Sequence, residues 1–152
     1  MPQITLTPIG VVHNEVAGPK HEGWEEVVSE IILAPVLRHA LEGIEGFSHL
    51  LVLTWLHQVP QEKRSLLQIH PMDREDVPLV GVFATRTQYR PNPIGVSIVR
   101  LLERRDHILV VRGLDALDGT PVLDIKPYAP HHEPSGPVTV PEWVSRLHDA
   151  RH

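Results

Sequence analysis

Polar side chains on a stiff backbone make residues 81–97 the stretch of this chain best suited to chemistry. Arg86 carries a guanidinium that can hold an anionic ligand group, and Asn92 carries an amide that can grip a substrate through hydrogen bonds. Asn92 lies between two prolines, which fix their own φ angles and keep Arg90 and Asn92 extended. A segment of this kind is either a turn or a rigid platform for chemistry, and these residues alone favour the turn.

Short strands are the elements that would position this stretch, because apolar and β-branched residues recur in short runs between prolines, glycines and polar loops. We expect strands at residues 4–13, 27–33, 47–56, 80–85, 94–102, 106–112 and 121–125. Residues 47–56 are almost continuously apolar, which is typical of a strand buried on both faces. Asp118-Gly119 predicts a hairpin between the last two strands, since both central positions of a type I′ turn need φ > 0.

Helices are expected to be few and short, because the chain contains 15 prolines. Residues 35–43 and 141–149 each begin with a proline in the first turn, which is typical of a helix start. Residues 14–23 are expected to form a loop, and residues 57–78 are long enough for a functional lid or a disordered segment. About seven strands with one or two short helices predict a mainly β protein, a small antiparallel barrel or sandwich.

The composition fits one globular domain, with 152 residues, 41% of them apolar and 22% charged. We assign residues 1–135 to that domain and residues 136–152 to a short C-terminal tail or helix, with no additional domain. The absence of cysteine excludes disulfides and thiolate metal sites. No apolar run reaches the roughly 20 residues of a membrane span, and the N-terminus lacks the pattern of an export signal. We therefore expect a cytoplasmic protein that makes no use of a membrane.

Several common functional sites have no counterpart in the sequence. There is no Gly-x-Gly-x-x-Gly and no phosphate-binding loop ending in Lys-Ser or Lys-Thr, which argues against a Rossmann site. His131-His132-Glu133 could ligate a metal, but neighbouring side chains on an extended chain point apart, so a solvated loop is favoured and no metal is expected. The net charge of −5 argues against strong nucleic-acid binding, although it does not forbid a local basic patch.

Several motifs together resemble one known family. They are Ile9-Gly-Val-Val-His13, Gly46-Phe-Ser-His-Leu50, His57-Gln58, Gly81-Val-Phe-Ala-Thr-Arg86, Arg90-Pro-Asn-Pro-Ile-Gly95 and Leu117-Asp-Gly-Thr-Pro-Val-Leu-Asp-Ile-Lys-Pro-Tyr128. Over residues 4–130 the chain resembles the TsaA-like (TrmO, formerly YaeB) family of S-adenosylmethionine-dependent tRNA methyltransferases. The resemblance implies a small non-Rossmann β-barrel that binds S-adenosylmethionine and works as a homodimer. It also implies that the acceptor is N6 of threonylcarbamoyladenosine, the base next to the anticodon of threonine tRNA.

The resemblance further implies which residues bind the methyl donor: His21, Glu22, Gly23, His57, Gln58, Arg86, Val96, Leu117, Asp118, Gly119 and Thr120. A guanidinium suits the carboxylate of the donor, and exposed backbone groups of a turn suit the edge of its adenine. On the acceptor side, Asn92 is the candidate to grip the acceptor nitrogen or the base edge. Asp124 and Lys126 are candidates for proton handling and for steering an acidic substrate, and Tyr128 could stack on a base. A cross-strand ion pair is the alternative role for Asp124 and Lys126.

Departures from the family keep other functions open. Many members carry an extra C-terminal domain, whereas this chain has only about 20 residues after the tyrosine motif, and its acidic charge fits tRNA poorly. A basic surface could form from Arg86, Arg90, Arg100, Arg104 and Arg105, or these residues could simply be solvated. The alternatives are a small-molecule N- or O-methyltransferase and a non-catalytic module that binds S-adenosylmethionine or RNA.

Overall fold

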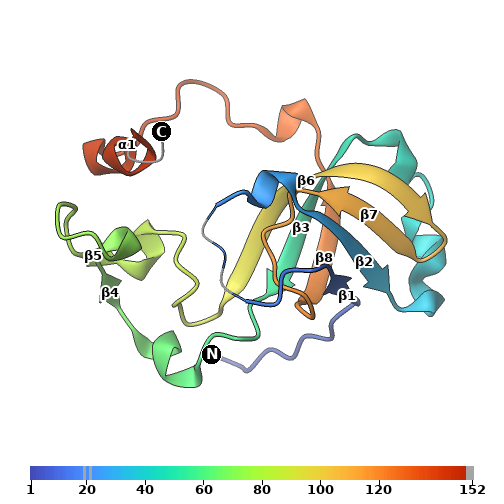
Figure 1. The fold of residues 1–152 in the computed structure, drawn as a ribbon, viewed down its shortest axis with the longest axis horizontal. Helices are drawn as coiled ribbons and strands as arrows, with labels where there is room; N and C mark the ends of the chain where they lie inside the picture. Colours follow the sequence, from blue (N-terminus) through green and yellow to red (C-terminus); the bar gives the residue numbers. More distant parts are fainter. Residues whose placement is uncertain (19, 21, 150–152) are drawn as a thin grey trace. The chain divides into compact units, whose positions relative to one another are not determined.

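The chain folds mainly into short antiparallel strands, as the apolar runs predict (Figure 1). The structure is a computed structural model, and it describes residues 1–18, 20 and 22–149. Six strands close a barrel in the order β1-β2-β7-β6-β3-β8, with every neighbouring pair antiparallel. Their bounds are β1 Gly10–His13, β2 Val28–Leu33, β3 His49–Trp55, β6 Ile94–Arg105, β7 Ile108–Arg112 and β8 Pro121–Pro127. The prediction of a mainly β protein built on a small antiparallel barrel is confirmed.

The chain divides into two compact units. The first unit comprises Met1–Gln58 and Pro93–Ala129, and it holds the barrel and the short 3-10 helices η1 Trp24–Glu26, η2 Pro35–Leu41 and η3 Ile44–Gly46. The second unit comprises Val59–Asn92 and the chain from Pro130 onward. Its elements are η4 Gln61–Ser65, β4 Gln68–Ile69, η5 Pro71–Asp73, β5 Val80–Gly81, η6 Val82–Ala84, η7 Pro130–His132 and α1 Glu142–Asp149. Both predicted helices exist, although the one beginning at Pro35 is a 3-10 helix. None of the helices in the described part of the chain is long and apolar enough to cross a bilayer.

The barrel core comes from the inward-facing positions of its strands. Fully buried apolar side chains of the strands fill it: Val12, Ile31, Leu50, Val52, Val99, Leu109, Val111 and Val122. These positions alternate with outward-facing ones, as the two-residue period of a strand requires. The core therefore fixes which side chains of each strand face the solvent.

The prediction that residues 47–56 form a strand buried on both faces is wrong. In β3, Leu50, Val52 and Thr54 are 0%, 0% and 2% exposed, whereas the residues between them are only partly buried. An antiparallel barrel has one interior, so each strand has only one face that the barrel itself can bury. The apolar residues at the outer positions of β3 must have another role.

Two predicted strands are shorter than expected. Residues 4–9 lie outside any strand, and β1 begins at Gly10, where a Cβ would lie 2.5 Å from the carbonyl oxygen of Ile32. Only Val80–Gly81 of the predicted strand at 80–85 pairs as a strand. The hydroxyl and the backbone N–H of Thr85 both donate to the Val82 carbonyl, at 2.7 and 3.1 Å, and this closes a 3-10 turn instead.

The predicted hairpin at Asp118-Gly119 does not form. Strand β7 pairs with β2 and β6, whereas β8 pairs with β1 and β3, so the two strands are not neighbours. A type I′ turn needs a positive φ at both central residues, but of these two only Gly119 has one, at 86°. The backbone N–H of Gly119 donates instead to the Val12 carbonyl at 2.8 Å, so the turn packs against β1.

Candidate functional site

The connection between β7 and β8 is fastened to the end of β1 by hydrogen bonds. Oδ1 of Asp118 accepts the backbone N–H of Asn14 at 3.0 Å and lies 3.0 Å from Nδ1 of His13. The backbone N–H of Asp118 donates to the Val16 carbonyl at 2.7 Å. The Asn14 N–H, and after it His13, lower the pKa of the Asp118 carboxyl. The side chain of Asp118 thus holds this connection in place.

Asn14 completes that attachment with its own side chain. Its Nδ2 donates to Oγ of Ser29 and to the Ala116 carbonyl, both at 2.9 Å, and its Oδ1 accepts the Val16 N–H at 2.9 Å. The sequence analysis did not identify Asn14, because a lone asparagine after a strand is typical of any loop. Its hydrogen bonds make residues 116–118 a fixed surface.

The turn from Leu117 to Thr120 presents two carbonyl groups. The Leu117 carbonyl accepts both the hydroxyl and the N–H of Thr120, at 2.6 and 3.1 Å, and Thr120 is 2% exposed. Within the described residues, the carbonyls of Asp118 and Gly119 accept no hydrogen bond. The turn therefore offers acceptors for the donor groups of a ligand.

His57, just beyond the end of β3, lies against this turn. Its Nε2 is 3.9 Å from the position that a Cβ on Gly119 would occupy, and both His57 and Gln58 are exposed. The structure therefore brings together two predicted donor-binding segments that are about 60 residues apart in the chain.

Asp115 is a carboxylate at the same connection that the sequence analysis did not identify. Its backbone N–H donates to Oγ of Ser97 on β6 at 3.3 Å. Although Asp115 keeps contact with solvent, neighbouring protein atoms partly desolvate its carboxyl and raise its pKa. A carboxylate with a raised pKa accepts protons more readily near neutral pH.

The other predicted donor-binding residues of the first unit lie elsewhere on it. Gly23 has φ 79° and precedes η1, and within the described residues no hydrogen bond joins it or Glu22 to the 117–120 turn. Val96 is 46% exposed and faces Leu53, on the outer wall of the barrel. His21 lies outside the described residues. For these residues donor binding stays a prediction.

Asp124 and Lys126 form an ion pair on the outer wall. Nζ of Lys126 lies 3.1 Å from Oδ2 of Asp124, and both residues belong to β8, so the pair runs along one strand and not across two. Tyr128 comes directly after β8. An extended chain rises about 3.3 Å per residue, so Tyr128 lies roughly 26 Å from Thr120. Within one chain, Lys126 and Tyr128 are therefore distant from His57.

Arg90 and Asn92 lie in the second unit, on a segment ordered by side-chain hydrogen bonds. Nη1 of Arg90 donates to the carbonyls of Thr85 and Thr87, at 3.1 and 3.0 Å. Nε of Arg64 donates to the Pro91 carbonyl at 2.8 Å. Asn92 is exposed, and its side chain has no hydrogen-bond partner within the described residues. These contacts make the segment rigid while leaving the Asn92 amide available.

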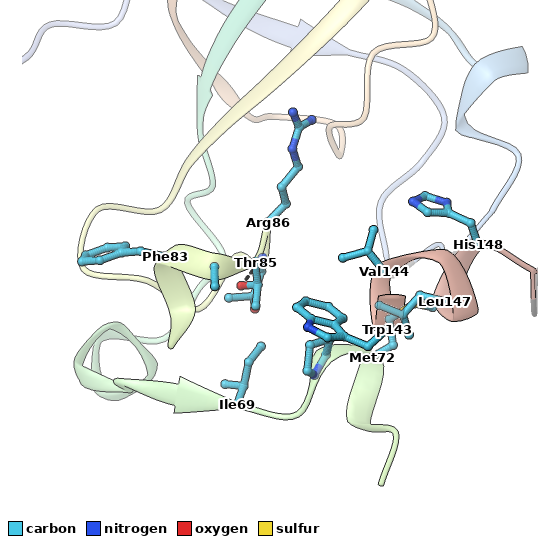
Figure 2. Close-up of a pocket in the computed structure, with 12 residues that line it drawn as sticks. Ile69, Met72, Phe83, Thr85, Arg86, Trp143, Val144, Leu147 and His148 are labelled. Atoms are coloured by element: carbon cyan, nitrogen blue, oxygen red, sulfur yellow. Dashed lines mark hydrogen bonds between the residues drawn. The ribbon is translucent and has the colours of Figure 1, made fainter. Parts of the chain in front are cut away.

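Arg86 lies beside a cavity of about 840 Å³ within the second unit. Figure 2 shows Ile69 and Met72 near Trp143 of α1, whereas the Phe83 ring and the Arg86 guanidinium point away from it. Arg86 is exposed and has no ion pair within the described residues. The volume suits a small-molecule ligand, and the guanidinium could hold an anionic group.

The five arginines expected to form a basic surface have different roles. Arg104 is 17% exposed on its side chain and binds Glu45 and the carbonyls of Arg38 and Leu41. Arg105 pairs with Glu30 at 2.9 Å, and Arg90 is held by its two carbonyls. Only Arg86 and Arg100 of the five lack such partners within the described residues.

The histidine pair after the barrel is compact and not extended as expected. His131 lies in η7, and its ring centroid is 4.2 Å from that of His132. Across the described residues, no three histidine, aspartate or glutamate side chains gather as metal ligands would.

The fold and the site define a class of protein: a closed antiparallel barrel whose β7–β8 connection is hydrogen-bonded to the end of β1, beside His57. Residues 12–133 match the family model described as the tRNA-methyltransferase O N-terminal domain. The chain belongs to this TrmO family.

Relatives and solved structures agree with that assignment. An S-adenosyl-L-methionine-binding protein of Archaeoglobus fulgidus is 40% identical over 82% of this chain and 89% of its own length. The crystal structure of TrmO from Pseudomonas aeruginosa superposes with a TM-score of 0.70 and 34% identity, over 91% of this chain and 62% of that one. A longer Archaeoglobus fulgidus relative, described as a probable S-adenosyl-L-methionine-binding protein, is 42% identical over 83% of this chain. This chain spans only 34% of that relative.

Proposed function

We propose that the chain binds S-adenosylmethionine at the barrel end and transfers its methyl group to N6 of threonylcarbamoyladenosine, next to the anticodon of threonine tRNA. The observation that supports this most directly is the proximity of His57 to the turn, because its Nε2 lies 3.9 Å from the position that a Cβ on Gly119 would occupy. It joins two segments that the family resemblance assigns independently to the donor, on a surface fixed by Asp118 and Asn14.

The chemical groups at this end fit the donor. The carbonyls of Asp118 and Gly119 suit the amino group of adenine, and the exposed side chains of His57 and Gln58 can bind its polar groups. The family resemblance assigns Arg86 to the donor, and its guanidinium, which has no ion pair of its own in the described chain, suits the donor carboxylate.

The donor supplies an electrophilic methyl carbon bonded to a sulfonium sulfur. As the acceptor nitrogen forms its bond to carbon, the carbon–sulfur bond breaks and the nitrogen loses its proton. The Asn92 amide is available to orient the acceptor. Asp115 joins Asp124 as a candidate proton acceptor, because desolvation raises its pKa and it forms no ion pair within the described residues, whereas Asp124 is paired with Lys126.

A second copy of the chain is the proposed partner of the apolar outer wall. Ile94, Val96 and Ile98 on β6 are 41%, 46% and 52% exposed, and they face Trp55, Leu53 and Leu51 on β3. An exposed apolar band of this kind marks an interaction surface, and the family resemblance supports a homodimer. Ile98→Glu should shift the protein to a monomer in analytical ultracentrifugation, whereas Val36→Glu, at a residue 85% exposed on η2, should not. A dimer that survives Ile98→Glu would exclude this surface.

A methyl-transfer assay tests the proposed reaction. Purified protein with tritiated S-adenosylmethionine should label threonine tRNA that carries threonylcarbamoyladenosine and should leave unmodified threonine tRNA unlabelled. Donor binding in calorimetry together with unlabelled modified tRNA would refute the acceptor. Label in a small metabolite would then support the small-molecule methyltransferase, and no transfer to any acceptor would support the non-catalytic module.

A further inference from the structure

Strand register places a row of outward-facing side chains across the barrel wall, away from the His57 end. His49 on β3 faces Arg100 on β6, and Arg100 faces Arg112 on β7. Adjacent strands lie about 4.8 Å apart, so these three residues span about 10 Å. Tyr128 continues the row beyond His49, because its N–H donates to the His49 carbonyl at 3.1 Å. We call His49, Arg100, Arg112 and Tyr128 the arginine row.

The side chains of His49, Arg100 and Arg112 point outward because their strand neighbours point inward. Leu50, Val99 and Val111 are 0%, 1% and 0% exposed, and each lies next to a member of the row. Arg100 and Arg112 are themselves exposed. The row is therefore part of the outer surface of the barrel.

Arg100 and Arg112 face each other without a partner of opposite charge. Neither forms an ion pair within the described residues. Glu30 and Glu103 face Val110, two residues from Arg112, but both of them pair with Arg105. The Cα of Glu25 lies 4.0 Å from the position of a Cβ on Gly113, and Glu25 forms no ion pair with Arg112 within the described residues. Like charges directly opposite each other on neighbouring strands are destabilising. An anionic ligand would remove that repulsion.

Other arginines of the same strand show that the barrel can pair its cations. Arg105 on β6 lies 2.9 Å from Glu30 and 3.8 Å from Glu103. Arg104 pairs with Glu45 at 3.1 Å. The lack of an acidic partner is thus specific to Arg100 and Arg112, since other arginines of the barrel have one.

We propose that the arginine row binds the phosphates of a single-stranded RNA segment, with Tyr128 placed to stack on a base. The proposal rests on the proposed tRNA acceptor and assigns a surface to it. Guanidinium groups bind phosphate oxygens with paired hydrogen bonds, and an aromatic face beside a basic strip is typical of single-strand binding. A length of about 10 Å suits a few nucleotides of a loop better than a long duplex.

The test measures binding of a fluorescent anticodon stem-loop RNA of threonine tRNA as a function of salt. For a single strand, each phosphate contact contributes about 0.7 to the magnitude of the slope of log K against log salt concentration. At about 0.1 M salt, loss of one such contact lowers the affinity about fivefold. Arg100→Gln/Arg112→Gln should therefore bind about 25-fold more weakly, with a slope smaller by about 1.4. Arg105→Gln, at a paired arginine of the same strand, should bind within about twofold of the unaltered protein.

A second variant separates RNA binding from a structural role. Arg100→Glu would place a negative charge between His49 and Arg112, so the melting temperature should rise by roughly 1–4 °C while RNA affinity falls. A purely structural role would move stability and binding in the same direction and would overturn the proposal.

The outcomes distinguish this proposal from the proposed reaction. RNA affinity and salt slope that stay unchanged in the double variant would overturn RNA binding by the arginine row, even if modified tRNA is methylated normally. Competition by poly-glutamate as strong as by tRNA would do the same. If the double variant binds RNA more weakly and the unaltered protein methylates no RNA, the arginine row is supported and the proposed reaction is refuted. Failure of the unaltered protein to bind the stem-loop would also overturn the row.

Discussion

Gly95→Ala is the substitution whose effect the structure defines most sharply. A Cβ at Gly95 would lie 2.7 Å from Oγ1 of Thr54 and 3.2 Å from Cδ2 of Leu56, and Thr54 is 2% exposed. Real side chains do not approach so closely, so β3 and β6 must separate or Thr54 must leave its rotamer. Overpacking of this kind costs about 1–3 kcal/mol of the free energy of unfolding. At roughly 2–4 °C per kcal/mol, the melting temperature should fall by roughly 2–12 °C.

A double-mutant cycle with Thr54→Ala tests the cause of that loss. Removing the hydroxyl should make the second substitution at Gly95 nearly neutral, giving a favourable coupling energy of about 1–2 kcal/mol in urea unfolding. Gly46→Ala is the matched control, because no atom lies within 4 Å of a Cβ there and φ is not positive, so stability should not fall. Equal stability losses from Gly95→Ala with and without the Thr54 hydroxyl would refute the packing explanation.

Further substitutions test the site itself. Arg86→Ala should weaken donor binding about 10-fold or more in calorimetry, as loss of a charged hydrogen bond does, with the melting temperature unchanged; unaltered affinity would exclude this role. Asn92→Ala should lower turnover about tenfold at unchanged donor affinity, and an unaffected rate would make residues 90–93 a simple turn. Asp115→Asn should stabilise the protein above the usual carboxyl pKa. The folded pKa is raised, so the folded state binds more protons, and stability is lost as pH rises through that raised value. If the difference in unfolding free energy between the two proteins did not change with pH, the desolvation of Asp115 would be contradicted.

The apolar pattern was sufficient to predict a mainly antiparallel β fold, with a barrel and a sandwich both open, but not the orientation of every strand. Alternation is visible in a sequence only when one face of a strand is polar. In β3 both faces are apolar, because Leu51, Leu53 and Trp55 cover the outside while Leu50 and Val52 fill the core. The misleading pattern is itself informative, since a half-buried strand with two apolar faces indicates a surface that something else covers.

Local turn signals were the least reliable guide to the site. Asp118-Gly119 predicts a hairpin from its two residues, but long-range pairing of β7 with β2 and β8 with β1 decides where the chain goes. The same two residues belong to the predicted donor-binding segment, and the turn they form is fixed by Asn14 and lies beside His57. Asp115 carries no such motif, and its carboxyl becomes unusual only through the protein atoms around it.

The arginine row shows the limit of sequence reasoning most clearly. Arg100 was named as part of a basic surface, but Arg112 was not, because its significance depends on a register that the sequence does not reveal. Charge composition argues against RNA binding, since the protein carries a net charge of −5. The fold changes that argument, because ion pairs neutralise Arg104 and Arg105 while leaving two arginines opposed on the outer wall. What decides whether an acidic protein can bind RNA is the number of cations left unpaired on one surface. Here register leaves two of them opposite each other, with His49 between them and Tyr128.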